Sequence, residues 1–249
     1  RMKGLLGRLL KKGAFAARPT CSAIIAAAGN SSRMGGENKL LMPLGGMPVL
    51  AHTLLAVERA EGVDEIVIAA REEELLTYAE LCKAYGLHKP IKVIVGGATR
   101  MESVLRAALE TRQDARLLAV QDGARPFVTP ALFDAVVLRA AACDAAAPAV
   151  PVHDTIKTAQ DGRVTGTPER STLFAVQTPQ VFDAGLLKAA LQSALADGVT
   201  LTDDCAAVER LGKAVYLTEG DEENIKITTP FDLLLAEAIL RRREEGAAE

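Results

Sequence analysis

Two cations near the start of the chain have the type and spacing to bind a polyphosphate. An apolar run at residues 23–28 has the length and bulk of a buried strand, and a loop of small residues begins at Gly29. Arg33 and Lys39 lie in the segment that follows. Such an arrangement brings backbone N–H groups and side-chain cations onto bound phosphates. The residues at the strand end that would let a ligand approach the backbone closely are Ala27, Ala28 and Gly29.

The same stretch has a plainer interpretation, an ordinary strand-to-helix turn with surface cations. Two well-known phosphate-binding patterns are missing from it. Gly29 does not open a G-x-G-x-x-G pattern, and the G-x-x-x-x-G-K-[ST] pattern is absent as well. A nicotinamide-dependent enzyme and a P-loop kinase are therefore both disfavoured.

Two further polar clusters follow predicted strands, at residues 96–103 and 122–125. Asp122 at a strand tip is suited to bind Mg²⁺ or a ribose, although a turn cap is the alternative role. Arg125 lies in the same cluster, and for it a structural role, pairing with a nearby carboxylate, is the alternative to binding a ligand. Thr99 and Ser103 are also candidates to cap a helix that starts near residue 100.

Strands alternate with helices over the first half of the chain. Further strands are predicted at residues 65–70, 91–95 and 117–121, and helices at about 49–60, 72–85 and 101–112. This alternation predicts an α/β fold, a Rossmann-like and mostly parallel sheet with helices on both faces. The carboxyl ends of parallel strands meet at one edge, where ligands bind. The three polar clusters are therefore expected to lie together there.

The pattern changes after residue 150. Short β-type runs separated by turn signals at 160–162 and 166–168 predict a protruding hairpin, a β-arm at about 150–180. Its exposed strands need a partner, which indicates a homodimer formed through the arm. Helices at 183–196 and 203–211, a strand at 214–217 and a closing helix follow. The face expected to point inward from that helix comprises Phe231, Leu234, Leu235, Ala238 and Ile239.

The composition is that of a globular protein. Of 249 residues 49% are hydrophobic and 24% charged, and the net charge of −3 argues against nucleic-acid binding. The four cysteines are scattered, so free thiols are expected, and zinc binding is not. Residues 1–20 are basic and predicted to be a disordered extension, whereas 21–249 are expected to form a single domain. With no signal peptide and no membrane span in the sequence, no membrane association is expected and the location should be cytoplasmic.

Taken in order, the motifs resemble those of the 2-C-methyl-D-erythritol 4-phosphate cytidylyltransferase family, over about residues 23–240. The matching segments are A-A-A-G with Arg33 and Lys39, G-G-A-T-R-M-E-S-V (96–104), V-Q-D-G-A-R-P (120–126), P-V-H-D-T-I-K (151–157), Arg170, Q-T-P-Q (177–180), T-D-D (202–204) and N-I-K-I-T (224–228). One departure is visible, because the family usually has Pro-Lys-Gln where this chain has Asn38-Lys39-Leu40. The lysine is kept, but a less rigid loop end is expected.

The resemblance implies a nucleotide-diphospho-sugar transferase-like fold and a role for each matching residue. Arg33, Lys39 and Lys226 would be the catalytic cations. The nucleotide would be bound by Ala27, Ala28, Gly29, Gly97, Ser103, Asp122 and Gly123, with Gly97 and Ser103 reading cytosine. The polyol phosphate would be bound by Thr155, Arg170, Thr178 and Arg125. Asp122 would also bind the Mg²⁺ cofactor.

The activity implied by the resemblance is transfer of CMP from CTP to 2-C-methyl-D-erythritol 4-phosphate. The products are 4-diphosphocytidyl-2-C-methyl-D-erythritol and pyrophosphate, in non-mevalonate isoprenoid biosynthesis. Ribitol-5-phosphate cytidylyltransferase is the nearest alternative; Asp154, Thr155 and Arg170 in the arm favour methylerythritol phosphate. A dinucleotide-dependent oxidoreductase is a remote alternative, disfavoured by the missing glycine pattern. A non-catalytic nucleotide sensor is disfavoured because all three cations are present.

Overall fold

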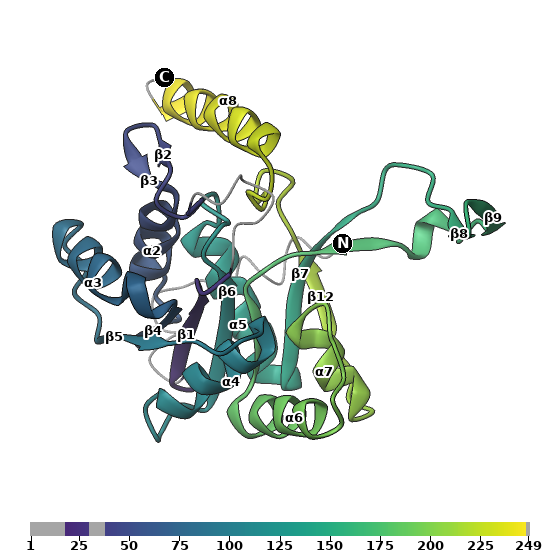
Figure 1. The fold of residues 1–249 in the computed structure, drawn as a ribbon, viewed down its shortest axis with the longest axis horizontal. Coiled ribbons are helices and arrows are strands. Elements are labelled where there is room, and N and C mark those ends of the chain that lie inside the picture. The colour runs from purple at the N-terminus through teal and green to yellow at the C-terminus, as the bar shows by residue number, and fades with distance from the viewer. Residues whose placement is uncertain (1–17, 30–37, 248–249) are drawn as a thin grey trace.

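A twisted, mostly parallel sheet forms the centre of the molecule (Figure 1). The computed structural model describes residues 18–29 and 38–247. Within these residues the strands of the sheet are β1 (Cys21–Ala26), β4 (Glu65–Ala70), β5 (Ile91–Val95), β6 (Leu117–Asp122), β7 (Ala145–Pro151), β10 (Phe174–Val176), β11 (Gln180–Asp183) and β12 (Tyr216–Glu219). Their order is β10-β7-β11-β6-β1-β4-β5, with β12 paired to β7. Only β10 and β11 pair antiparallel to their neighbours among these described strands, which confirms the predicted fold class.

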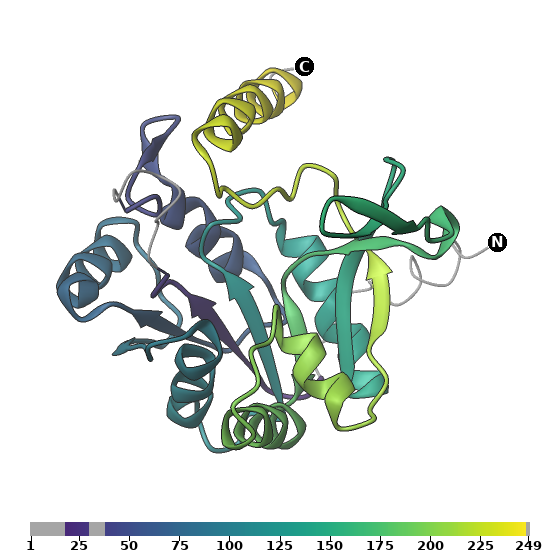
Figure 2. The ribbon, with the colours of Figure 1, turned by 45° about the vertical axis from the view of Figure 1, so that its right-hand side comes forward.

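Helices cover both faces of the sheet (Figure 2). One face carries α2 (Val49–Arg59), α3 (Leu75–Ala84) and α5 (Pro130–Cys143), and the other carries α4 (Arg100–Glu110), α6 (Ala184–Ala196) and α7 (Asp204–Arg210). A short hairpin of β2 (Pro43–Leu44) and β3 (Met47–Pro48) precedes α2, and the turn η3 (Glu72–Glu74) precedes α3. The last helix is α8 (Pro230–Ala247).

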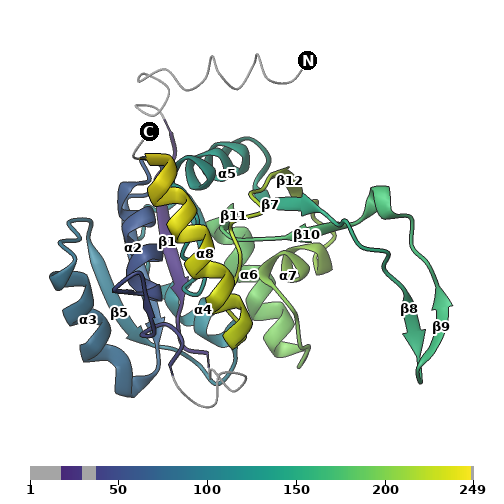
Figure 3. The same ribbon diagram turned by 90° about the horizontal axis from the view of Figure 1, so that it is seen from above.

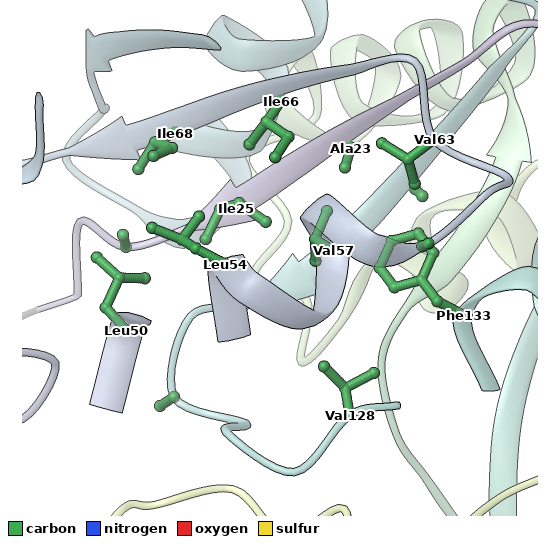
Figure 4. Packing of buried hydrophobic residues seen from close by; sticks show 14 of the residues in the cluster. Ala23, Ile25, Leu50, Leu54, Val57, Val63, Ile66, Ile68, Val128 and Phe133 are labelled. Atoms are coloured by element: carbon green, nitrogen blue, oxygen red, sulfur yellow. The ribbon is translucent and has the colours of Figure 1, made fainter. Parts of the chain in front are cut away.

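The core follows from the alternation of side chains along the strands. In β1, Ile25 packs into the cluster beneath α2, whereas its neighbour Ile24 packs toward α4 and α6 on the opposite face. Figure 4 shows Leu54 and Val57 of α2 pointing at the strands beside Ile25. β1 is central because it pairs in parallel with both β4 and β6. The strand that leads into the predicted phosphate loop is therefore rigidly held on both sides.

The central strands agree closely with the sequence predictions. β4 and β5 have the predicted bounds. β1 covers 21–26 instead of 23–28, so Ala27, Ala28 and Gly29 lie beyond the strand. The helix α5 and most of β7 were not predicted, because residues 130–149 are mostly apolar and their three charged residues mark no clear period.

The predicted inward face of the closing helix is wrong except at Ile239, which packs against the core. Phe231 and Leu234 are 73% and 69% exposed, whereas Leu233, Ala236 and Leu240 contact the core. The reason is that α8 packs beside the β2–β3 hairpin, as Figure 1 shows. There the backbone N–H of Gly45 donates to Glu237 (3.3 Å). Contact with this hairpin selects one of the two apolar faces that the sequence offers.

The predicted arm extends away from the sheet (Figure 3). Its tip is the hairpin of β8 (Thr158–Gln160) and β9 (Arg163–Gly166). The two tip residues, Asp161 and Gly162, both have positive φ angles, as a tight hairpin turn requires. The strand that returns from the arm, β10, pairs with β7 at the sheet edge.

At the other end of the chain, residues 1–17 of the predicted extension lie outside the described residues. Arg18 belongs to the folded body, since its guanidinium pairs with Asp64 at 2.8 Å. Asp64 also accepts a hydrogen bond from the backbone of Cys21 (2.8 Å), which ties this segment to the start of β1. Among the helices in residues 18–29 and 38–247, none combines the length and the apolar character that a membrane span needs.

Candidate active site

A cavity of about 390 Å³ lies at the carboxyl edge of the sheet. Its lining comes from the ends of β1, β4, β5 and β6, from Lys39 and Leu40, and from the loop before α8. The lining residues are Ala26, Ala27, Ala28, Gly29, Lys39, Leu40, Arg71, Gly97, Ala98, Thr99, Arg100, Ser103, Asp122, Ala124 and Lys226. Most of the predicted nucleotide-binding residues and two predicted catalytic lysines thus surround one space. Arg33, the third predicted cation, lies outside the described residues.

The end of β1 is fixed by backbone hydrogen bonds on both sides. The N–H of Ala27 donates to Ala69 (2.9 Å), and the N–H of Gly123 donates to Ala26 (3.1 Å). The carbonyl of Gly123 in turn accepts from the buried hydroxyl of Thr53 (3.0 Å). Gly123 therefore supports the floor of the cavity and is not among its described lining residues.

The turn between β5 and α4 is shaped by Ser103. The Ser103 hydroxyl accepts from the backbone N–H of Gly97 (3.0 Å) and donates to the carbonyl of Thr99 (2.8 Å). Thr99 caps the helix by accepting from the N–H of Glu102 (3.1 Å). A Cβ on Gly96 would lie 2.8 Å from the Ser103 oxygen, so the close approach requires glycine. Ser103 is buried, and its hydroxyl is already bonded to the turn.

Asp122 lies at the end of β6 among three cations. Its Oδ2 is 2.7 Å from Lys226 Nζ and 3.7 Å from Arg125 Nε, and its Oδ1 is 3.5 Å from Arg100 Nη2. Burial opposes the negative charge, but the three cations outweigh it and lower the pKa of Asp122 to about 2. Asp122 is therefore ionised at neutral pH.

Arg125 has partners that fit the structural role considered for it in the sequence analysis. Besides Asp122, its guanidinium donates to the backbone carbonyl of Asn224 (2.5 Å). Burial lowers the pKa of Arg125, and the nearby carboxylate of Asp122 opposes that shift. Because Asn224 is two residues from Lys226, this hydrogen bond ties the loop before α8 to the end of β6. Arg125 is not among the described residues that line the cavity.

Two charged residues of the site, Arg100 and Asp204, were given no role from the sequence. Arg100 lines the cavity, and its Nη1 pairs with Asp204 Oδ2 at 2.8 Å. Asp204 is 1% exposed, and its backbone N–H donates to the side chain of Gln180 (3.0 Å). Burial raises the pKa of Asp204, while Arg100 opposes that shift. Both residues lie inside motifs identified in the sequence, at residues 96–104 and 202–204. Their place in these motifs is the signal by which the sequence could have identified them as site residues.

Thr178 lies behind the cavity wall. It is buried, and its hydroxyl accepts a hydrogen bond from the backbone N–H of Asp122 (3.1 Å). Its carbonyl accepts from the side-chain amide of Asn224 (3.0 Å). Thr178 thus connects β6 with the loop that carries Lys226, and it is not among the described lining residues.

Thr155 and Arg170 lie on the arm, apart from the cavity. Arg170 begins the turn η4 (Arg170–Thr172), and its guanidinium donates to the carbonyl of His153 (3.0 Å). Neither residue is among the described lining residues. On the nearby edge strand β10, Phe174 and Val176 are exposed. Within a single chain, the structure therefore separates two of the four predicted polyol-phosphate residues, Thr155 and Arg170, from the nucleotide side of the site, whereas Thr178 and Arg125 contact Asp122 there.

The cavity suits an anionic ligand. Lys39, Arg71, Arg100 and Lys226 bring four cationic side chains to its lining. The small residues at the ends of β1 and β5 leave the backbone accessible to a ligand. Its volume is in the range typical of small-molecule sites. These features favour a nucleoside triphosphate.

A bound divalent metal would find one carboxylate in this lining. Among the described residues, no group of three or more His, Cys, Asp or Glu side chains is arranged to hold a metal ion. Asp122 fits as a single ligand through Oδ1, whose contact with Arg100 (3.5 Å) is longer than that of Oδ2 with Lys226 (2.7 Å). Mg²⁺ in proteins often has one or two carboxylates and completes its shell with water and substrate phosphates. The residues present are compatible with that kind of site.

Comparisons with known sequences and structures identify the family that the sequence motifs resemble. A family model described as 2-C-methyl-D-erythritol 4-phosphate cytidylyltransferase matches residues 21–242. A relative of that name from Synechococcus sp. (strain JA-3-3Ab) is 43% identical, over 90% of this chain and 98% of its own length. Another, from Bacillus cytotoxicus, is 45% identical, over 87% of this chain and 96% of its own length. A crystal structure of 4-diphosphocytidyl-2C-methyl-D-erythritol synthase from Anaerococcus prevotii superposes with a TM-score of 0.82 at 31% identity, covering 90% of this chain and 96% of the other. The crystal structure of 2-C-methyl-D-erythritol 4-phosphate cytidylyltransferase from Thermus thermophilus superposes with a TM-score of 0.71 at 33% sequence identity. It covers 88% of this chain and 98% of the other.

Proposed function

Because the chain belongs to the 2-C-methyl-D-erythritol 4-phosphate cytidylyltransferase family, we propose that it transfers CMP from CTP to 2-C-methyl-D-erythritol 4-phosphate. The products are 4-diphosphocytidyl-2-C-methyl-D-erythritol and pyrophosphate. The observation that carries this proposal is the cation-lined cavity at the carboxyl edge of the sheet, where the strand ends and Lys39, Arg100 and Lys226 converge. Such a cavity suits a triphosphate whose α-phosphate must be attacked by a second phosphate.

The reaction needs charge stabilisation more than covalent chemistry. An oxygen of the polyol phosphate forms a bond to the α-phosphorus of CTP, and the bond from that phosphorus to the β-bridging oxygen breaks. Pyrophosphate leaves with that oxygen. Because the substrate phosphate is itself the nucleophile, no covalent enzyme intermediate is needed. Negative charge gathers between three phosphate groups, and Lys39 and Lys226, which line the cavity, would lower its energy with their amines. Asp122 holds Lys226 in place through its 2.7 Å contact.

Cytosine would bind at the turn between β5 and α4. Gly97 and Ser103, the residues that the family resemblance assigns to cytosine, line the cavity. The Ser103 hydroxyl is hydrogen-bonded to the backbone of Gly97 and Thr99. Ser103 would therefore contribute to base recognition indirectly, by holding the Gly97 backbone toward the cytosine ring. A turn fixed in this way presents its N–H and carbonyl groups without a further loss of conformational freedom.

Mg²⁺ is part of the proposal, with Asp122 as its one protein ligand in the cavity. When bound, the ion would neutralise charge on the phosphates of CTP. Arg100 lies 3.5 Å from Asp122 Oδ1 and would keep that carboxylate oriented toward the phosphates.

The active enzyme is proposed to be a homodimer that shares its sites. Thr155 and Arg170 carry the chemistry to bind a second phosphate, yet in their own chain they lie on the outstretched arm (Figure 3). The edge strand β10 exposes Phe174 and Val176, which a second subunit would cover. A two-fold arrangement would place each arm at the cavity of the partner.

The cytoplasm is the proposed location of the enzyme. Cys21, Cys82, Cys143 and Cys205 are all free thiols in the described structure. Thiols remain reduced in the cytoplasm, whereas exported proteins usually pair them.

Substrate choice is tested by turnover. We expect CTP and Mg²⁺ to support rapid release of pyrophosphate with 2-C-methyl-D-erythritol 4-phosphate. Ribitol 5-phosphate should be used with at least roughly 100-fold lower kcat/KM, since the binding groups on the arm would be misplaced for it. A coupled pyrophosphate assay measures both substrates with one preparation. Higher activity with ribitol 5-phosphate would reverse the assignment of substrate.

The shared site is tested by subunit complementation. Arg170→Ala and Lys39→Ala enzymes, each nearly inactive alone, are mixed under conditions that allow subunit exchange. In a heterodimer, one site would then carry both substitutions and the other neither. Random exchange should restore about a quarter of the wild-type activity, since half of the dimers contain one intact site. A monomer in solution, or no recovery after verified exchange, would show that each arm serves its own subunit.

A further inference from the structure

We propose that Glu74 is a positioning residue for the reaction and acts on Lys39 through Asn38. This inference rests on the proposed function, in which Lys39 contacts the phosphates. Glu74 ends the short turn η3, which follows β4 on the side of the cavity where Arg71 lies. Neither Glu74 nor Asn38 lines the cavity among its described residues, so their effect must pass through a neighbour.

Glu74 is a buried carboxylate with three donors. It is 5% exposed. Its Oε1 accepts from the side chains of Asn38 and Arg71, and its Oε2 accepts from the hydroxyl of Tyr78 (2.9 Å). A buried carboxylate is costly unless its oxygens are bonded, so all three donors are fixed by it. The three come from different segments, namely the nucleotide loop, the end of β4 and α3.

Asn38 transmits this restraint to Lys39. Its side-chain oxygen accepts from the backbone N–H of Leu40 (3.0 Å), an Asx turn that encloses Lys39. Its side-chain nitrogen donates to Glu74 and to the hydroxyl of Tyr78 (3.0 Å). The backbone N–H of Leu41 also donates to the carbonyl of Asn38 (3.0 Å). The backbone on both sides of Lys39 is therefore held against α3.

Arg71 supplies the charge that Glu74 needs. Its guanidinium lines the cavity and pairs with Glu74, and also with Glu73 at 3.2 Å. The hydrogen bond to Glu74 raises the pKa of Arg71. Asn38 and Arg71 meet at the same oxygen of Glu74, so removal of its charge weakens both restraints at once.

A second buried carboxylate of the chain provides a matched control. Glu65 is 4% exposed and accepts from the hydroxyl of Ser22 (2.8 Å) and the backbone of Arg112 (2.8 Å). It begins β4, so it lies at the opposite end of that strand from the cavity. Glu65→Gln and Glu74→Gln make the same chemical change, but only the second affects a neighbour of Lys39.

The first test compares kinetics of the two variants well below their melting temperatures. Glu74→Gln should lower kcat by roughly 10-fold or more with a smaller change in the KM for CTP, because a misplaced lysine fails mainly in the transition state. Glu65→Gln should stay within about 2-fold of wild type, although its melting temperature falls. Asn38→Ala leaves the pair of Arg71 and Glu74 intact and should reproduce the kinetic loss. The kinetics of Asn38→Ala therefore test the inference even if Glu74→Gln does not fold.

The route through Lys39 is tested in the Lys39→Ala background. There, Glu74→Gln and Asn38→Ala should each add less than about 3-fold, since the group they position is gone. Losses that multiply fully would show that neither residue acts through Lys39. Equal losses in Glu74→Gln and Glu65→Gln would show a purely structural role.

Hydrogen exchange separates this inference from the proposed function. In Glu74→Gln the segment 38–42 should exchange faster than in wild type, because the Asx turn at Asn38 loosens. Glu65→Gln should leave that segment unchanged. This measurement needs no substrate, so unchanged exchange in Glu74→Gln overturns the inference whatever the enzyme acts on. Absence of wild-type turnover with methylerythritol phosphate would instead count against the proposed function alone.

Discussion

The Lys39→Ala enzyme is expected to lose roughly 100-fold or more in kcat, while its affinity for CTP falls far less. Lys39 lines the cavity beside the end of β1, where the triphosphate would lie. A cation that meets charge developing between phosphates stabilises the transition state more than the bound substrate. Steady-state kinetics measure kcat, and calorimetric titration with CTP measures the affinity. Arg33, although outside the described residues, is expected to give the same result.

Lys92→Ala is the control for this substitution. Lys92 lies on β5, outside the described lining, and its amine donates to the carbonyl of Glu110 (2.6 Å). Lys92→Ala removes an equal positive charge from outside the described lining and should leave kcat within about 2-fold of wild type. If Lys39→Ala keeps near-normal kcat, Lys39 serves only to bind CTP or has no direct role.

The central sheet was predictable because its strands have short, bounded apolar runs. Val67 and Ile68 in β4 face opposite layers and are both buried, so a continuous run marks the strand. The segment from Pro130 to Ala149 was not predictable in the same way. Apart from Asp134, Arg139 and Asp144 it is almost entirely apolar and rich in alanine, so neither the helix α5 nor the start of β7 shows a clear period.

The place of the site was predictable, but part of its charge network was not. Asp122 and Gly97 were identified because each follows a predicted strand, and parallel strands end at one edge. Arg100 and Asp204 depend on each other, and the link of Glu74 to the nucleotide loop depends on Asn38, so each of these contacts joins residues distant in sequence. Arg100 pairs with Asp204 across 104 positions (204 − 100), and no local pattern reports such a contact.

The last prediction concerns the balance of charge at Asp122. Asp122→Asn should destabilise the protein by about 3 kcal/mol, which lowers the melting temperature of a chain of this size by roughly 6–12 °C. The cause is that Arg100, Arg125 and Lys226 would lose the one carboxylate that lies between them. Activity should be lost as well, since Lys226 would no longer be held at the cavity.

The pH dependence of that destabilisation follows from the pKa of Asp122. Its pKa in the folded state is about 2, below the ordinary value of 3.8, so the charged form stabilises the fold. This stabilisation is complete above the ordinary pKa and disappears as the pH falls through about 2. The difference in melting temperature between wild type and Asp122→Asn should therefore be constant from about pH 6 to 9 and shrink in acid.

A second substitution distinguishes charge balance from lost packing. Lys226→Met in the Asp122→Asn background removes one of the repelling cations and leaves a side chain of similar length. The double variant should regain part of the lost melting temperature, whereas Lys226→Met alone should lower it slightly by leaving Asp122 less well paired. Activity should not return in the double variant, because the lysine that faces the phosphates is missing. Additive losses of stability in the double variant would show that Asp122 holds the strand end by its hydrogen bonds and not by its charge.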